Sequence, residues 1–89
     1  MKVIFSEHAL FEIEFRKIKK EDIEHLIEHP MQKKLGMKNR IIMQSRYYDN
    51  KENKEMVLRV IGEELENEFH VVTVYKTSKI EKYWKEDLK

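Results

Sequence analysis

Several residue types that carry enzyme chemistry are missing or scarce in this chain of 89 residues. There is no cysteine, which excludes disulfides, thiolate metal sites and cysteine nucleophiles. There are only two glycines and one proline, and no glycine-rich loop that could wrap a phosphate. No Ser–His–Asp arrangement can be argued from the order of the residues. Any active site must therefore use other side chains.

The net charge is also close to zero, because the chain has 18 lysines and arginines and 17 aspartates and glutamates. The formal charge of +1 excludes a generic polycation that coats nucleic acid, although a local basic patch is compatible with it. No long apolar run is present, so neither a signal peptide nor a membrane span is predicted, and we expect a cytoplasmic protein. The length suits one domain over residues 1–89, because two cores would leave each half near the lower limit for independent folding.

Charged residues are nevertheless abundant, at 39% of the chain. Lysine and glutamate dominate them, while glutamine and asparagine are few. This composition is typical of thermophile proteins, which carry many ion pairs and few thermolabile amides. A codon bias towards Lys, Glu and Ile would produce the same composition.

The first third of the chain has the periodicity of a short strand followed by two helices. Residues 2–5 are predicted to form the strand. Ser6 can cap a helix whose apolar side chains would form one broad face: Ala9, Leu10, Phe11, Ile13, Phe15 and Ile18. A second helix over residues 21–28 would turn three apolar side chains inward: Ile23, Leu26 and Ile27. Pro30 ends it, because the residue before a proline is pushed out of the helical region.

From Asn39 onwards the hydrophobic period changes to two, which indicates strands. Three strands are predicted, separated by a polar turn (49–54) and an acidic loop (62–68): residues 39–48, 55–61 and 69–75. A short helix is predicted between Ser78 and Lys89. The fold class is therefore α+β, with a strand, two helices, a three-stranded antiparallel meander and a short C-terminal helix. The first two helices would cover one face of the sheet, and the other face would stay open apart from the C-terminal segment.

Positive charge is concentrated on the predicted meander. Residues 30–61 hold eight basic and three acidic residues, while both ends of the chain have a net charge of −2. Side chains alternate between the two faces of a strand, so Arg40 and Arg46, which are six residues apart, lie on the same face of the first strand of the meander. Arg59 is expected on that face of the next strand, so all three arginines would lie on the open face. Guanidinium groups match phosphate oxygens, so these arginines would form a phosphate cradle. The alternative is a solvated surface, because the open face of a one-sided sheet must be polar.

Four other side chains could move protons or bind phosphate. Tyr75 could polarise a ribose hydroxyl or stack a base, and His70 could act as a general base near neutral pH. The alternation puts these two residues on opposite faces of their strand and leaves open which one joins the arginines. His8 and Arg16 lie two turns apart on the first helix, where a helix-start histidine and a surface ion pair with Glu12 are the ordinary interpretations. For the two strand residues the ordinary interpretation is a half-buried side chain with one hydrogen bond.

One five-residue segment, HLIEH, fits a metal-binding pattern. His25 and His29 are four residues apart on one helical face, with Glu28 beside the second histidine. That face points away from the apolar side of the helix, towards solvent, and no third ligand can be assigned. We therefore predict no bound metal and no cofactor.

Two segments carry a family resemblance. The first is FSEHALFEIEFRKIKKEDIEHLIEHP, which has a serine, a histidine–alanine pair, an arginine two turns later, and a second helix that starts with acids and ends near a proline. The second is VVTVYKTSKIEKYW, a final strand and tail. Together they cover about half of the chain and resemble an uncharacterised family of small bacterial and archaeal domains, the domain of unknown function 4258. That family is grouped with the RelE/ParE toxin superfamily, and its layout looks like that of BrnT toxins.

The resemblance implies a RelE-like fold whose open sheet face holds the active site. Toxins of this kind cut mRNA, some only on the ribosome, and a cognate antitoxin holds them inactive. The implied function is that of a type II toxin, a metal-independent endoribonuclease that cuts RNA through attack of the 2′-hydroxyl. Two groups of residues are then candidates: His8, Arg46, His70 and Tyr75 for catalysis, and Arg16, Arg40, Arg59 and Lys76 for binding RNA phosphates. The alternative is a non-enzymatic member of the same fold that binds a partner protein.

Overall fold

The structure is a computed structural model that describes residues 1–85. Its helices and strands follow the chain in this order: β1 (Lys2–Phe5), α1 (Glu7–Phe15), α2 (Lys20–Glu28), β2 (Gln32–Leu35), β3 (Ile41–Asp49), β4 (Lys54–Leu65), β5 (Glu68–Thr77) and α3 (Ile80–Tyr83). A 3₁₀ turn, η1 (Met37–Asn39), precedes β3. The strands form one mixed sheet in the order β1-β5-β4-β3-β2, in which only β1 and β5 run parallel. The α+β class is confirmed, but the sheet has five strands and is larger than the predicted three-stranded meander.

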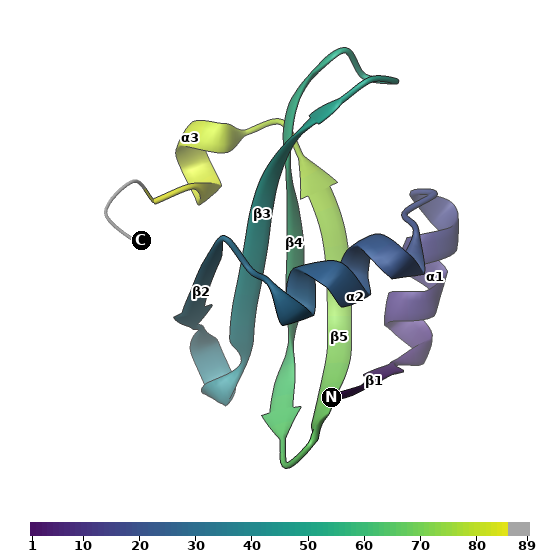
Figure 1. Ribbon diagram of the computed structural model, residues 1–89, viewed down its shortest axis with the longest axis vertical. Coiled ribbons are helices and arrows are strands. Elements are labelled where there is room, and N and C mark those ends of the chain that lie inside the picture. Colours follow the sequence, from purple (N-terminus) through teal and green to yellow (C-terminus); the bar gives the residue numbers. More distant parts are fainter. Residues whose placement is uncertain (86–89) are drawn as a thin grey trace.

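The two longer helices lie on one face of the sheet. Helix α2 crosses in front of the central strands and α1 runs beside β5 (Figure 1). Helix α3 lies against the opposite face, where the backbone carbonyl of Tyr83 accepts a hydrogen bond from Gln44 (2.9 Å). We call the face opposite α1 and α2 the open face. None of the helices in residues 1–85 is long and apolar enough to cross a membrane.

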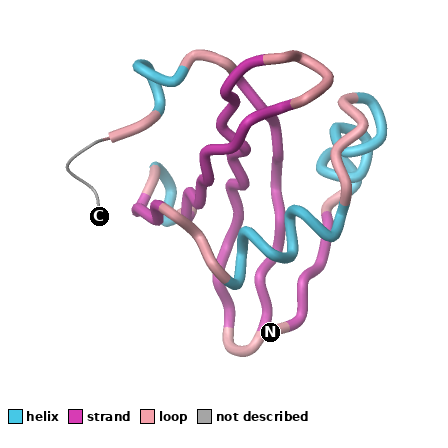
Figure 2. The backbone as a smooth tube through the Cα atoms, turned by 45° about the horizontal axis from the view of Figure 1, so that its top comes forward, coloured by secondary structure: helices cyan, strands magenta, loops and turns pink. Residues whose placement is uncertain are grey.

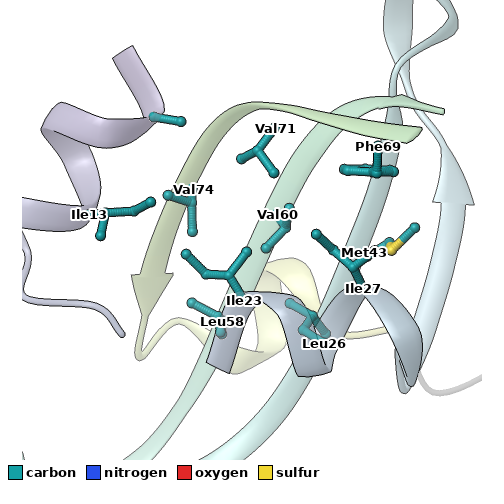
Figure 3. Close-up of a cluster of buried hydrophobic side chains, with 11 residues drawn as sticks. Ile13, Ile23, Leu26, Ile27, Met43, Leu58, Val60, Phe69, Val71 and Val74 are labelled. Atoms are coloured by element: carbon teal, nitrogen blue, oxygen red, sulfur yellow. The ribbon is translucent and has the colours of Figure 1, made fainter. Parts of the chain in front are cut away.

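The hydrophobic core fills the space between these two helices and the sheet. Figure 3 shows the side chains of α2 facing those of β3, β4 and β5. The buried cluster consists of Ala9, Ile13, Ile23, Leu26, Ile27, Met43, Leu58, Val60, Phe69, Val71 and Val74. The three residues of the second helix that were predicted to point inward are all in this cluster, so that prediction is confirmed.

Helix α1 buries a narrower face than predicted. Ala9 and Ile13 are in the core, whereas Phe11 and Phe15 are 61% and 70% exposed. The two phenylalanine rings stack on each other with their centroids 5.7 Å apart. Each residue advances about 100° around a helix, so Phe11 lies about 200° from Ala9. A helix that touches the sheet on one side cannot bury both, and the prediction of one broad apolar face is wrong.

We expect Phe11→Ser and Phe15→Ser each to change the free energy of unfolding by less than about 0.5 kcal/mol, because neither ring is in the core. Ile13→Ala should lower that free energy by about 2–4 kcal/mol, because it leaves a cavity in the core. Urea denaturation of the three variants makes the comparison. A loss above about 2 kcal/mol for either phenylalanine variant would mean that these rings are buried in solution.

Two segments that were not predicted as strands belong to strands. Strand β2 pairs with β3, and its sequence QKKL has no β-branched residue that would indicate a strand. Residues 62–68, predicted as an acidic loop, are mostly part of β4 and β5, which are joined by a turn at Glu66 and Asn67. Asn67 adopts the left-handed conformation (φ 61°), which asparagine tolerates. The helix predicted over residues 78–89 is the single turn α3, and its predicted part beyond residue 85 lies outside the described residues.

A β-bulge in β5 changes which side chains reach the open face. Two consecutive residues of β4 have partners that are two residues apart on β5, namely Ile61 with Thr73 and Gly62 with Val71. Val72 is therefore left without a partner on β4. The extra residue shifts the alternation of β5 by one, so that inward and outward positions exchange at the bulge.

Because of the bulge, His70 and Tyr75 both face the open side. His70 is opposite Glu63, and Tyr75 is opposite Arg59. The prediction that these two residues lie on opposite faces is wrong, because it assumed unbroken alternation along the strand.

Ser6 connects the bulge to the start of α1. Its hydroxyl donates a hydrogen bond to the carbonyl of Val72 (3.0 Å), which is the unpaired residue of the bulge. The same oxygen accepts a hydrogen bond from the backbone N–H of Ala9 (3.0 Å), so the predicted cap is confirmed. A backbone group that the sheet leaves unpaired is thus satisfied by the capping residue.

Candidate phosphate-binding site

The register of the sheet arranges the open face in rows that cross the strands. One row consists of Gln32, Gln44, Arg59 and Tyr75, which are opposite one another on β2, β3, β4 and β5. Arg46 lies two residues further along β3, which makes it a diagonal neighbour of Arg59 with Cα atoms roughly 7–8 Å apart. Arg46 and Arg59 therefore meet on one small area of the open face, as their parity predicts.

Arg40 also belongs to the open face but lies far from the other two arginines. It is six residues from Arg46 along an extended strand, a separation of roughly 20 Å. Its Nε lies 3.7 Å from Oε2 of Glu63. The predicted cradle of three arginines is therefore a cluster of two.

The C-terminal segment adds two aromatic rings to this cluster. The guanidinium carbon of Arg59 lies 4.2 Å from the ring centre of Tyr83 and 5.7 Å from that of Tyr75. The guanidinium carbon of Arg46 lies 5.7 Å from the ring centre of Trp84. These distances are within the range of cation–π interactions. We call Arg46, Arg59, Tyr75, Tyr83 and Trp84 the arginine site.

Arg59 is buried and has unused hydrogen-bond donors. Only 5% of its surface is exposed, and its Nε and Nη1 atoms have no hydrogen-bond partner among residues 1–85. Burying a charged group without such partners is costly, and stacking on two phenol rings offsets only part of that cost. The side chain therefore offers positive charge and free N–H groups to an anion that enters beneath α3.

Arg46 differs from Arg59 because it is 31% exposed and has a carboxylate partner. Its Nη2 and Nε atoms lie 2.8 and 3.2 Å from Oε1 of Glu55. The hydrogen bond from Arg46 lowers the pKa of the Glu55 carboxyl, although partial burial acts in the opposite direction. An anion that binds Arg46 must therefore compete with Glu55.

The two tyrosines of the arginine site have opposite tendencies to ionise. Their ring centres are 6.0 Å apart in an edge-to-face arrangement. Burial raises the pKa of Tyr75, although the charge of Arg59 acts against it. Burial also opposes the ionisation of Tyr83, but Lys82 and Arg59 outweigh it and the pKa of that phenol is lowered. Neighbouring groups whose pKa values are pushed apart suit the roles of a base and an acid.

Two buried glutamines hold the C-terminal segment on the open face. Gln44 donates hydrogen bonds to the carbonyl of Tyr83 (2.9 Å) and to Oε1 of Gln32 (2.6 Å). The side chain of Gln32 donates to the carbonyl of Lys85 and accepts from the N–H of the same residue (3.3 Å). An amide side chain that pairs with both backbone groups of one residue holds it as a neighbouring strand would. Strands β2 and β3 therefore fix α3 over Arg59.

The two histidines that were catalytic candidates are not part of the arginine site. His70 faces the open side but is five residues from Tyr75, and its Nε2 lies 2.8 Å from Oε1 of Glu68. His8 is exposed on α1, on the far side of the sheet. The length of β5 separates His70 from the arginines, and the sheet separates His8 from them. Neither distance can be predicted from the alternation of side chains along a strand.

Two predicted phosphate contacts lie on the helix-covered side. Arg16 forms an ion pair with Glu12 one turn earlier on α1. The Nζ of Lys76 lies 3.4 Å from Oδ2 of Asp49. Of the eight candidate residues, the structure thus brings together Arg46, Arg59 and Tyr75.

His25 on α2 and His29, which caps the C-terminal end of α2, are both exposed to solvent as predicted, and their ring centres are 5.1 Å apart. Within residues 1–85 no group of three histidine, aspartate or glutamate side chains is arranged to hold a metal ion.

These observations define a small α+β domain with a cluster of two arginines and three aromatic rings on the open face of its sheet. The model of a family described as a domain of unknown function (DUF4258) matches residues 5–77. The chain therefore belongs to this family. Comparison with curated proteins gives no match, and comparison with solved structures gives none either. The matched segment contains Arg46, Arg59 and Tyr75 and ends before α3.

Proposed function

We propose that this protein is the toxin of a type II toxin–antitoxin pair, a metal-independent endoribonuclease with a RelE-like fold of the RelE/ParE superfamily, close to BrnT toxins in layout. The observation that carries the proposal is Arg59, which is buried with unused N–H groups between two tyrosines and beside Arg46. RNA cleavage without a metal needs cations for the phosphate and groups that exchange protons, and the arginine site contains both. The arginine site lies on the open face, opposite α1 and α2, which is where the resemblance to RelE/ParE toxins implies an active site.

In the proposed reaction, the phenolate of Tyr83 accepts the proton of the ribose 2′-hydroxyl. The 2′-oxygen attacks the neighbouring phosphorus, and the bond from phosphorus to the 5′-oxygen breaks. Tyr75 donates a proton to that leaving oxygen, which yields a 2′,3′-cyclic phosphate and a 5′-hydroxyl. Arg46 and Arg59 stabilise the negative charge that accumulates on the phosphate. The tyrosines take these roles in place of the two candidate histidines, which lie outside the arginine site.

Access to Arg59 depends on α3. Arg46 can be reached from solvent, whereas Arg59 lies under the ring of Tyr83. A phosphate that contacts both arginines requires the ring of Tyr83 to turn away from Arg59, while the hydrogen bonds from Gln32 and Gln44 keep the backbone of the C-terminal segment on the sheet. RNA, free or on the ribosome, would offset the cost of turning the ring by stacking bases on the exposed aromatic rings. In the same proposal a cognate antitoxin holds the protein inactive in the cytoplasm.

The test is cleavage of RNA by the purified protein in the presence of EDTA, with the product ends identified by mass spectrometry. We expect a 2′,3′-cyclic phosphate. Arg46→Ala should lower the rate about ten- to a hundredfold, because a hydrogen bond to a charged group is worth roughly 1.5–3 kcal/mol. Glu55→Gln should tighten RNA binding, because it removes the carboxylate that competes for Arg46.

Arg40→Ala is the matched control for Arg46→Ala. Both arginines face the open side and both pair with a glutamate, but Arg40 lies roughly 20 Å away along β3. The control should therefore keep the wild-type rate. Equal losses in the two variants, or cleavage that requires an added metal, would refute the proposal.

A non-enzymatic interaction module is the second candidate, favoured by one observation. The side chain of Gln32 binds both backbone groups of Lys85, so the open face already binds the backbone of one residue of the C-terminal segment. A partner peptide could take the same place. Harmless overexpression in a bacterial host, together with an absence of RNA cleavage, would favour this module over the toxin.

A further inference from the structure

A cleft lies on the helix-covered side of the molecule, separate from the arginine site. It is bounded by the end of α1, the start of α2 and the loop between β3 and β4, which reaches towards α1 in Figure 2. Its volume is 640 Å³, within the usual range of pockets that bind small molecules. Ile18, Leu26 and Leu58 give it an apolar wall. We call it the helix-side cleft.

The lining of the helix-side cleft is more positive than the chain as a whole. Five basic and three acidic side chains line it, and one of the basic side chains, Arg16, is paired with Glu12 outside the lining, so this small part of the surface has an excess of one positive charge against +1 for the whole chain. Three of the basic side chains, Arg16, Lys17 and Lys19, come from the connection between α1 and α2 and are exposed. Lys17 adopts the left-handed backbone conformation (φ 54°), which is uncommon for lysine. The connection thus gathers cations beside an apolar wall, which suits an organic anion.

Lys76 supplies a further cation from the sheet. Its partner, Asp49, already accepts hydrogen bonds from the backbone N–H groups of Glu52 (3.0 Å) and Lys51 (2.8 Å). The hydrogen bond from Glu52 is the main cause of the lowered pKa of Asp49. The ammonium group of Lys76 has three donors, and its contact with Asp49 is long at 3.4 Å. Donors of Lys76 therefore remain for a ligand.

Tyr47 is a neutral side chain beside Lys76, since both donate to Oδ2 of Asp49. Its hydroxyl lies 3.5 Å from Oδ2 of Asp49. Burial, with the negative charge of Asp49, raises the pKa of Tyr47 to about 12, so the phenol keeps its proton at physiological pH. The phenol donates its single proton to Asp49, so Tyr47 adds no negative charge to the cleft and an anion there is bound by the cations.

We propose that the helix-side cleft binds a small organic phosphate, with its phosphate on Lys76 and the cations of the α1–α2 connection and its organic part on the apolar wall. The excess positive charge selects an anion, and the apolar wall selects one that carries a ring or another apolar group. Arg16 and Lys76 would then contact phosphate at a site separate from the arginine site, where the ligand competes with Glu12 and Asp49 for them. This proposal does not depend on RNA cleavage.

The test is an NMR titration of the full chain with adenosine 5′-monophosphate and, separately, with inorganic phosphate. The nucleotide should bind more tightly, because its ring can occupy the apolar wall. It should shift the amide signals of Ser45, Tyr47 and Lys76, which line the helix-side cleft. Arg46→Ala should bind the nucleotide like the wild type, which separates this site from the arginine site.

The variant that tests the cations is Lys17→Gln combined with Lys19→Gln, since both side chains are exposed and neither is buried in the core. It should weaken nucleotide binding about tenfold. The matched control is Lys33→Gln combined with Lys38→Gln, two exposed lysines that do not line the helix-side cleft, and it should bind normally. Equal losses in the two double variants, equal affinity for nucleotide and inorganic phosphate, or shifts confined to the arginine site would overturn the proposal.

Discussion

Gly62→Ala should lower the free energy of unfolding by about 3 kcal/mol, which corresponds to a fall of roughly 12–24 °C in melting temperature for a domain of this size. A Cβ atom at Gly62 would lie 2.2 Å from the backbone oxygen of His70 and 2.6 Å from Cε1 of Phe69. The backbone oxygen cannot rotate away as a side chain can, so β4 and β5 would have to separate at the bulge. The variant should also loosen Phe69, which is fully buried in the core.

Gly36→Ala is the natural control, because these are the only two glycines of the chain. A Cβ atom at Gly36 would lie 2.9 Å from Cδ1 of Ile42, the far end of a flexible side chain that can rotate away. The expected loss is below about 1 kcal/mol. Thermal melts followed by circular dichroism, with urea denaturation, compare the two variants. Similar stabilities would mean that β5 does not approach Gly62 as closely as the structure has it.

The helices and the central strands could be predicted because their signals are local. Ser6 begins α1, and the inward residues of α2 follow the helical period. Strand β2 and the bulge escaped prediction because they depend on how distant segments pair. Gly62 was assigned to the predicted acidic loop, whereas a glycine recognised inside a strand would have indicated a bulge or a close approach of another backbone.

The alternation of side chains along a strand predicts which face of the sheet each site residue occupies, and to that extent the candidate site was predictable. Parity places Arg46 and Arg59 on one face, but it cannot give the distance that separates Arg40 from them. Tyr83 and Trp84 escaped prediction as site residues because their position depends on the return of the C-terminal segment to the sheet. One residue indicates that this segment returns to the sheet. Gln44 is a polar side chain that pairs with Arg59 and is buried, so another segment must cover it and bind its amide group.

Tyr83→Phe should lower the rate of RNA cleavage by about 10²- to 10⁴-fold, the usual effect of losing a general base. Phenylalanine keeps a ring over Arg59, and the backbone carbonyl of residue 83 still accepts the hydrogen bond from Gln44. The variant therefore removes the hydroxyl and leaves α3 docked. Tyr48→Phe is the matched control, because Tyr48 has open-face parity but its hydroxyl binds Asn53 (2.6 Å) in the β3–β4 turn. That control should cleave RNA at the wild-type rate.

The pH profile of the same reaction distinguishes proton transfer from a structural role of Tyr83. Tyr83 acts as a phenolate, so the rate should rise with pH up to its lowered pKa and then fall above the raised pKa of Tyr75, which must keep its proton. Lys82→Gln should move the rising limb to higher pH, because burial would then raise the pKa of Tyr83 with less opposition from positive charge. Tyr83→Phe should remove the rising limb, and Tyr75→Phe the falling one. A rising limb that survives in Tyr83→Phe would mean that another group takes the 2′-hydroxyl proton.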